Sequence, residues 1–175
     1  MTISHAAIVG AGISGLTAAL ALARHGISSE IFEQADALAE VGAGLQISPN
    51  ASRCLAKIGV LGRLEGQWRE PKKVALASGL TLRELAHVPV GEARKRWGAP
   101  YGTLHRATLQ SALKHAVADE PLATLRLGAR IDKAKSIPST RTCRTTFPLI
   151  ILEVMNFLGR RQITTTRWRW WWIRF

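Results

Sequence analysis

The pattern of apolar and polar positions in the first 33 residues predicts a strand, a helix and a second strand in unbroken succession. Residues 7–9 form a short apolar run of the kind found in strands buried on both faces. Over residues 14–25 the apolar side chains recur at helical spacing, and Gly26 follows where a left-handed C-terminal cap belongs. Residues 30–32 then predict the second strand.

The turn between the first strand and the helix has the spacing GxGxxG. Its six residues are Gly10, Ala11, Gly12, Ile13, Ser14 and Gly15. In a dinucleotide-binding turn the first glycine allows the tight turn, the second admits the pyrophosphate, and the third lets the helix pack closely on the sheet. The helix N-terminus then directs unpaired amides at the phosphates. Taken alone, the motif is also compatible with an ordinary tight turn.

An acidic residue, Glu33, ends the predicted second strand, 18 residues after Gly15. A carboxylate at this place accepts hydrogen bonds from ribose hydroxyls, and it favours the free ribose diol of FAD or NAD over a 2′-phosphate. These elements thus follow one another in the order and at the spacing of a dinucleotide-binding unit: a strand, a turn, a helix, a second strand and an acidic residue. The sequence predicts an α/β, Rossmann-like dinucleotide-binding domain with a parallel sheet.

In the middle of the chain the alternation of strands and helices seen in the first βαβ unit is interrupted. Residues 41–45 form a second small-residue segment, in which the glycines could equally be ordinary turn residues. Pro49 opens a predicted helix. Residues 72–85 alternate loosely around a turn at residues 78–79, which predicts a β-hairpin. We interpret the region of about 70–100 as the start of a β-rich substrate layer.

Three further features have plainer interpretations. The basic cluster at residues 94–96, beside Trp97, could contact an anionic ligand or nucleic acid, but a solvated helix end is favoured because no aromatic ladder accompanies it. A helix is predicted from about Arg106, followed by a strand at 122–127 that returns to the parallel sheet. His105 and His115 are expected to face solvent or make local hydrogen bonds.

Composition narrows the class of protein. A chain of 175 residues with 47% hydrophobic content is long enough for one globular core. No segment reaches the 18 apolar residues of a membrane span, and no signal peptide is evident, so a cytoplasmic location is expected. Cys54 and Cys143 stand alone, which argues against a disulfide framework or a zinc site.

The net charge of +12 is unevenly distributed. Residues 1–134 hold 16 basic and 11 acidic residues, a net of +5, whereas residues 135–175 hold 8 and 1, a net of +7. The body therefore has a mildly basic, solvated surface, and no specific nucleic-acid role is expected.

Three segments of the chain together resemble the single-component FAD-dependent aromatic hydroxylases of the salicylate hydroxylase type. In order they are VGAGISGLTAALAL with IFEQ, EVGAGLQISPNASRCL, and YGTLHRATLQSAL, and the resemblance covers about residues 5–133. It implies that the glycine turn and Glu33 hold the ADP half of FAD. It also implies that the segment with Ala43 and Gly44 runs past the flavin end of the cofactor. The side chain of Arg106 is implied to contact the cofactor.

The chemistry implied by the resemblance is hydroxylation of a small aromatic substrate. NADH or NADPH reduces the flavin, which then activates oxygen, while protein groups position the reactants and exclude water. No catalytic residue and no metal site is predicted in this chain. The alternative is a non-catalytic fragment that binds an adenine dinucleotide, either FAD or NAD.

The sequence departs from the family after about residue 135. Members of the family are much longer and carry a DG-containing strand and a later GD segment, neither of which is present. Residues 135–175 instead contain seven threonines and four of the six tryptophans. We interpret this segment as a poorly ordered basic tail produced by a change of reading frame, and the domain as residues 1–134. Its interleaved cations and indoles suit a lipid headgroup interface or a stacked nucleic acid, and could adhere non-specifically to anionic surfaces.

Overall fold

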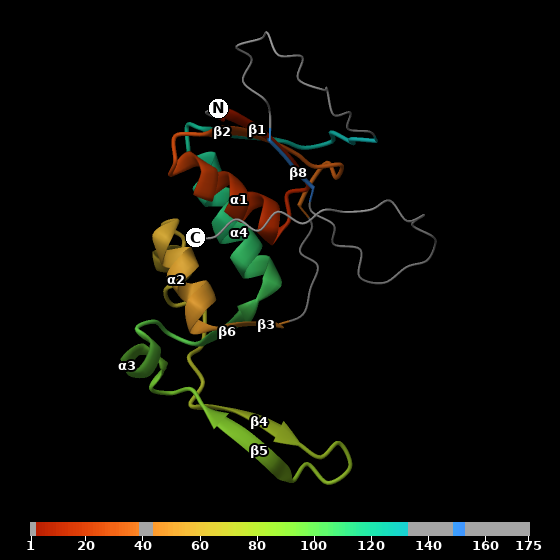
Figure 1. Ribbon diagram of the computed structural model, residues 1–175. Helices are drawn as coiled ribbons and strands as arrows, with labels where there is room; N and C mark the ends of the chain where they lie inside the picture. Colours follow the sequence, from red (N-terminus) through yellow and green to blue (C-terminus); the bar gives the residue numbers. More distant parts are fainter. Residues whose placement is uncertain (1–2, 39–43, 133–148, 153–175) are drawn as a thin grey trace, which may run out of the picture.

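The computed structural model describes residues 3–38, 44–132 and 149–152. Its central element is a four-stranded sheet in the order β7, β2, β1, β8, with every neighbouring pair parallel. The strands are β1 (His5–Val9), β2 (Ser28–Phe32), β7 (Ala123–Arg126) and β8 (Leu149–Leu152). Figure 1 shows the sheet at one end of the molecule, with the helices below it. None of the described helices is long and apolar enough to cross a membrane.

Helices α1 (Ile13–Ala23) and α4 (Arg106–Ala118) pack against each other beneath the sheet (Figure 1). Each buries one apolar face, as the helical spacing predicted. The core between the sheet and the two helices is fully closed at Ile8, Leu16, Ile31 and Leu113, each 0% exposed. The buried face of α1 begins at Gly15 and Leu16, so the core also holds the glycine turn from which α1 starts.

A second region lies at the N-terminal end of α4. It contains an antiparallel pair, β3 (Gly44–Ile47) and β6 (Gly102–His105), beside helix α2 (Pro49–Lys57). The short helices η1 (Leu61–Leu64) and α3 (Ala93–Trp97) complete it. Trp68 packs on the backbone of Gly102, where an added Cβ would lie 2.3 Å from its ring. Any larger residue at position 102 would displace that ring.

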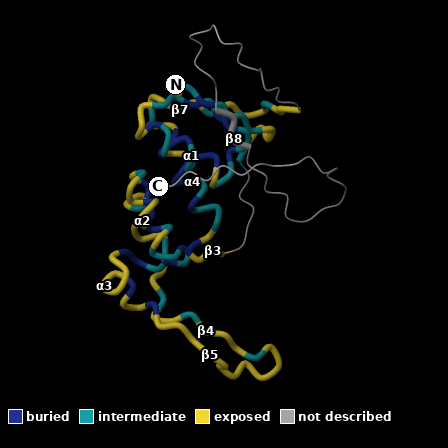
Figure 2. Tube along the Cα trace, in the orientation of Figure 1, coloured by how far each residue is buried: buried dark blue, intermediate teal, exposed yellow. Residues whose placement is uncertain are grey.

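A hairpin of β4 (Lys73–Ala77) and β5 (Glu84–Pro89) projects away from the helices (Figure 1). Figure 2 shows that the hairpin is mostly exposed, whereas buried residues gather around α1, α4 and the sheet.

The local elements predicted from the sequence are confirmed. They include the left-handed Gly26, with a φ of +71°, the helix opened by Pro49, and the hairpin. The returning strand is β7, which pairs with β2. Two pairings were not predicted. One is β3 with β6, and the other is β8, which lies within the segment interpreted as a tail and pairs with β1.

Candidate functional site

The glycine turn has the backbone geometry that two of its glycines were predicted to provide. Gly10 has a φ of +99°, a region that L-residues rarely adopt, and its amide donates to the carbonyl oxygen of Phe32 over 2.8 Å. A Cβ at Gly15 would lie 2.0 Å from the carbonyl oxygen of Gly10. The close approach of α1 to the turn therefore excludes every side chain at position 15.

Gly12 has a different role, because its backbone does not require glycine. Its φ of −71° and ψ of −177° are open to any residue. Gly12 is the N-cap of α1, which has no side-chain cap and no acidic residue in its first turn. The amides of Gly12, Ile13 and Ser14 have no acceptor among the described residues. They are free to bind an anion, and a small residue at position 12 leaves room for it.

The carboxylate of Glu33 lies against this turn. One oxygen accepts a hydrogen bond from the amide of Ala11 over 2.8 Å, and the other accepts from the amide of Ala35 over 3.0 Å. The backbone of Glu33 is held as well, because its amide donates to Arg126 and its carbonyl accepts from Ala129. An ionised carboxylate has about four acceptor sites, so both oxygens can accept a further hydrogen bond.

Gln110 on α4 also contacts the turn, and the sequence did not reveal it. Its side-chain amide donates to the carbonyl oxygen of Ala11 over 3.1 Å. Ala11, which is fully buried, is therefore held from both sides by Glu33 and Gln110. The available signal was spacing, since Gln110 lies four residues after Arg106 and shares its helix face.

Gly44 and Arg106 lie close together at the N-terminus of α4. In the antiparallel pair of β3 and β6, Gly44 is opposite His105, and Arg106 is the first residue of α4. Arg106 is half-buried, and its side chain has no hydrogen bond or ion pair with a described residue. Ala43 lies outside the described residues. The site thus has two parts joined along one face of α4: the glycine turn near Gln110, and the segment around Arg106.

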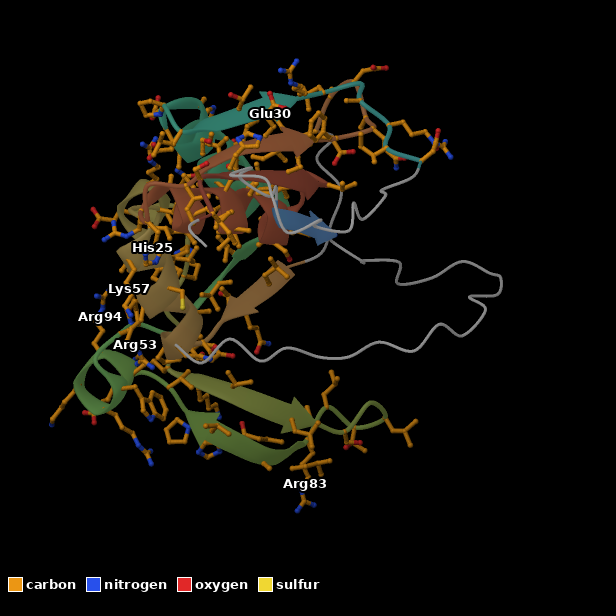
Figure 3. The ribbon with its side chains drawn as sticks, turned by 45° about the horizontal axis from the view of Figure 1, so that its top comes forward. His25, Glu30, Arg53, Lys57, Arg83 and Arg94 are labelled. Carbon is orange, nitrogen blue, oxygen red and sulfur yellow. The ribbon has the colours of Figure 1, made fainter. Side chains whose placement is uncertain are left out.

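The other candidate groups have local partners. Arg94 forms an ion pair with Glu70, 2.6 Å between Nη2 and Oε1, and this hydrogen bond raises the pKa of Arg94. Arg53 donates to the carbonyl oxygen of Trp97. Figure 3 shows Arg53, Lys57 and Arg94 along one side of the molecule, at α2 and α3. The solvated interpretation of residues 94–96 agrees with these contacts. Among the described residues no His, Cys, Asp and Glu side chains group as a metal site.

Comparison with known proteins places this fold in a class. Residues 8–40 match the NAD(P)-binding Rossmann-like domain. The chain is 36% identical over 132 residues to 3-hydroxybenzoate 6-hydroxylase 1 of Aquipseudomonas alcaligenes, a match of 75% of this chain and 34% of that protein. It is 39% identical over 108 residues to 3-amino-4-hydroxybenzoate 2-monooxygenase PtmB3 of Streptomyces platensis, covering 61% of this chain and 27% of that protein.

Solved structures agree on the fold. HpxO of Klebsiella pneumoniae, crystallised with FAD, is similar with a TM-score of 0.63 and 24% identity, over 77% of this chain and 33% of that one. The resemblance to the N-terminal part of the FAD-dependent aromatic monooxygenases is therefore confirmed, as is the Rossmann-like α/β fold. The chain spans about a third of the length of the curated relatives that it matches.

Proposed function

We propose that this chain binds FAD by its ADP half, with the pyrophosphate at the N-terminus of α1 and the adenosine ribose on Glu33. The observation that carries the proposal is the position of the Glu33 carboxylate, held at the glycine turn by the amides of Ala11 and Ala35. Two hydrogen bonds fix its orientation while both oxygens keep acceptor capacity for the ribose diol. The amides of Gly12, Ile13 and Ser14, for which the described residues offer no acceptor, are the matching anion donors.

The flavin side of FAD is proposed to extend along α4 toward Arg106. The half-buried guanidinium has no partner among the described residues. A Cβ added at the neighbouring Gly44 would lie 3.9 Å from the carbonyl oxygen of Leu104. A cation suits a cofactor that carries carbonyl and phosphate oxygens, and a small residue leaves room for its flat ring. Ala43 is proposed as its neighbour. When bound, FAD supplies the redox chemistry, while these residues hold and orient it.

For the whole protein to which such a domain contributes, we propose NADH- or NADPH-dependent hydroxylation of a small aromatic substrate. The relatives named above carry the names of hydroxybenzoate hydroxylases and monooxygenases. This chain by itself is proposed to be inactive, because holding reactants in attack geometry needs walls around the flavin, and misplacement by about 1 Å costs about a hundredfold in rate. The ion pair of Glu84 and His87 is exposed on the hairpin, which projects away from α1 and its glycine turn (Figure 1).

A second candidate is an adenine-dinucleotide-binding fragment that accepts FAD or NAD without catalysis. It is favoured by the glycine turn itself, since the features described there recognise an ADP group common to both cofactors. Parallel titrations with FAD and NADH separate the two candidates. Clear preference for FAD supports the first, and equal affinity supports the second.

The proposed absence of activity is tested with purified chain, excess FAD, NADH or NADPH, and salicylate or related phenols under air. Nicotinamide oxidation and hydroxylated product are followed together. We expect neither to exceed the rate of free FAD. Substrate-stimulated oxidation coupled to product would contradict the proposal and assign the activity to this chain.

The basic tail at residues 135–175 lies mostly outside the described residues, and its role is a separate proposal. Its net charge of +7 and clustered indoles should make the chain adhere to anionic surfaces, less so at high salt. Binding to anionic vesicles with and without added salt tests this. A cytoplasmic location is likewise proposed, and imaging of the full chain in cells tests it.

A further inference from the structure

The polar backbone groups at the start of the glycine turn are fixed by contacts within the domain. The amide of Gly10 donates to the carbonyl oxygen of Phe32, and the amide of Ala11 donates to the carboxylate of Glu33. The carbonyl oxygen of Gly10 lies against α1, 2.0 Å from the place that a Cβ on Gly15 would take. The first peptide plane of the turn, between Gly10 and Ala11, is therefore held at both its carbonyl and its amide.

The next peptide plane, between Ala11 and Gly12, carries the first amide of the proposed anion site. Its carbonyl oxygen, on the fully buried Ala11, accepts the hydrogen bond of 3.1 Å from the side-chain amide of Gln110. The carbonyl and the amide of a trans peptide point in opposite directions, and no peptide bond among the described residues is cis. The contact with Gln110 on α4 therefore directs the Gly12 amide away from α4, where no described residue accepts from it.

This second plane needs support from outside the turn, because glycine at position 12 leaves it free to rotate. A peptide plane flips by opposite changes in the ψ of the residue before it and the φ of the residue after it. Gly12 has a φ of −71° here, but glycine adopts positive φ about as readily as negative φ. The small residue that leaves room for a pyrophosphate thus also lets the amide turn away from it. A hydrogen bond to the Ala11 carbonyl opposes that flip.

Gln110 is carried by a well-packed part of the domain. Its helix, α4, packs on α1 beneath the sheet (Figure 1), and the flanking Leu109 and Leu113 are buried in the core. The side chain of Gln110 is itself half-buried. A hydrogen-bond donor on a packed helix is held more precisely than one on a loop. The position of the Ala11 carbonyl, and with it the orientation of the Gly12 amide, is therefore set by the packing of α4 on α1.

We propose that Gln110 is a positioning residue for the pyrophosphate of the dinucleotide. It acts through the peptide between Ala11 and Gly12 and not by contact with the cofactor, because it holds the Gly12 amide in the orientation from which that amide donates to a phosphate oxygen. The inference rests on the proposed binding of the ADP half at this turn. Two side chains thus act at Ala11: Glu33 holds its amide and accepts from the ribose, and Gln110 holds its carbonyl and orients the phosphate donor.

The first test is calorimetric titration of ADP-ribose into the full chain and into Gln110→Leu, which keeps a side chain of similar size and removes its donor. We expect the affinity to fall at least about tenfold, because a misaligned amide makes a weaker hydrogen bond to a phosphate. Gln67→Leu is the matched control. The side-chain amide of Gln67 also donates to a backbone carbonyl, that of Arg63, over 3.1 Å, but it does so at an exposed position just beyond η1. This control should bind ADP-ribose like the unchanged chain.

Nuclear magnetic resonance separates positioning from a loss of stability. In the unchanged chain, saturating ADP-ribose should shift the Gly12 amide proton downfield, as hydrogen bonding to a phosphate does. In Gln110→Leu this shift should shrink, while the shifts of the Ile13 and Ser14 amides persist. Equal affinity and an equal Gly12 shift in the variant, or an equal loss at all three amides, would overturn the inference and leave the proposed function standing. No binding of ADP-ribose by the unchanged chain would overturn the proposed function and this inference with it.

A second variant keeps the test decisive if Gln110→Leu does not fold. In Gln110→Glu the carboxyl can donate to the Ala11 carbonyl only when it is protonated. Relative to the unchanged chain at the same pH, its affinity for ADP-ribose should rise at least about threefold from about pH 8 to about pH 5. Glu33 titrates in both proteins, so its effect cancels. Ser111→Glu adds the same charge to the exposed face of α4 and should show no such rise. An equal rise in both variants, or none in Gln110→Glu, would overturn the inference.

Discussion

The carboxylate of Glu33 and the backbone amide of Ala11 are joined by a hydrogen bond of 2.8 Å. This contact ties the end of β2 to the glycine turn at the end of β1, across 22 residues of sequence. It places the group that is proposed to hold the ribose next to the amides that are proposed to hold the pyrophosphate.

Removal of this carboxylate should therefore weaken cofactor binding. We expect Glu33→Ala to lower the affinity for FAD and for ADP-ribose alike, by about 1.5 to 3 kcal/mol, the usual contribution of a hydrogen bond to a charged group. Calorimetric titration measures both. Glu65→Ala is the control, because it removes the same charge from an exposed position. Equal affinities in the Glu33 variant and the unchanged chain would exclude Glu33 from the site.

The glycines of the turn should respond differently to substitution. Gly12→Val keeps an accessible backbone conformation, so we expect helix content to persist while dinucleotide binding is lost, because the side chain occupies the space of the pyrophosphate. Gly15→Ala forces a Cβ to within 2.0 Å of the Gly10 carbonyl oxygen and should destabilise the fold itself. Circular dichroism with titration distinguishes them. A folded Gly12 variant that binds normally would reduce the motif to a structural turn.

Arg106 should affect the two ligands unequally. Because it lies beside Gly44 and away from the glycine turn, we expect Arg106→Met to lower the affinity for FAD about tenfold or more and to leave ADP-ribose nearly unchanged. Lys114→Met removes an exposed charge from the same helix and serves as the control. An equal effect on both ligands would place Arg106 at the ADP end.

Two buried serines should change the stability in opposite directions. The Oγ of Ser29 in β2 has no hydrogen-bond partner in the part of the chain that the structure describes, whereas the Oγ of Ser52 in α2 donates to the carbonyl oxygen of Pro100 over 2.8 Å. Ser29→Ala should raise the free energy of unfolding by about 1 kcal/mol, since an unsatisfied buried hydroxyl is removed. Ser52→Ala should lower it by about 1 kcal/mol. Chemical denaturation of both variants provides the measurement, and the same sign for both would be inconsistent with these contacts.

The first βαβ unit could be predicted from sequence because each of its signals is local. The apolar run of β1, the spacing of Gly10 and Gly15, and the acid after β2 all lie within 29 residues of one another. Short-range sterics alone require glycine at the two positions, as the φ of Gly10 and the approach at Gly15 show. The resemblance to the FAD-dependent aromatic hydroxylases then indicated FAD as the cofactor.

The remaining parts of the site depend on contacts between distant residues. Gln110 reaches Ala11 across 99 positions. Its spacing from Arg106 indicates a shared helix face, but it does not identify Ala11 as the residue contacted. The pairing of β3 with β6 also joins residues far apart in the sequence, and its short strands carry little periodic signal. The irregular pairing between Leu76 and Ala77 of the hairpin could not be predicted either, because it depends on the register of the two strands.

The central claim, that the described site holds the ADP half of FAD, is tested most directly by competition. FAD is titrated into the full chain alone, then in the presence of saturating ADP-ribose or of FMN, which lacks the ADP half. We expect FAD to bind, ADP-ribose to displace it and FMN to leave it bound. Displacement by FMN but not by ADP-ribose, or no binding of FAD and ADP-ribose at all, would contradict the account.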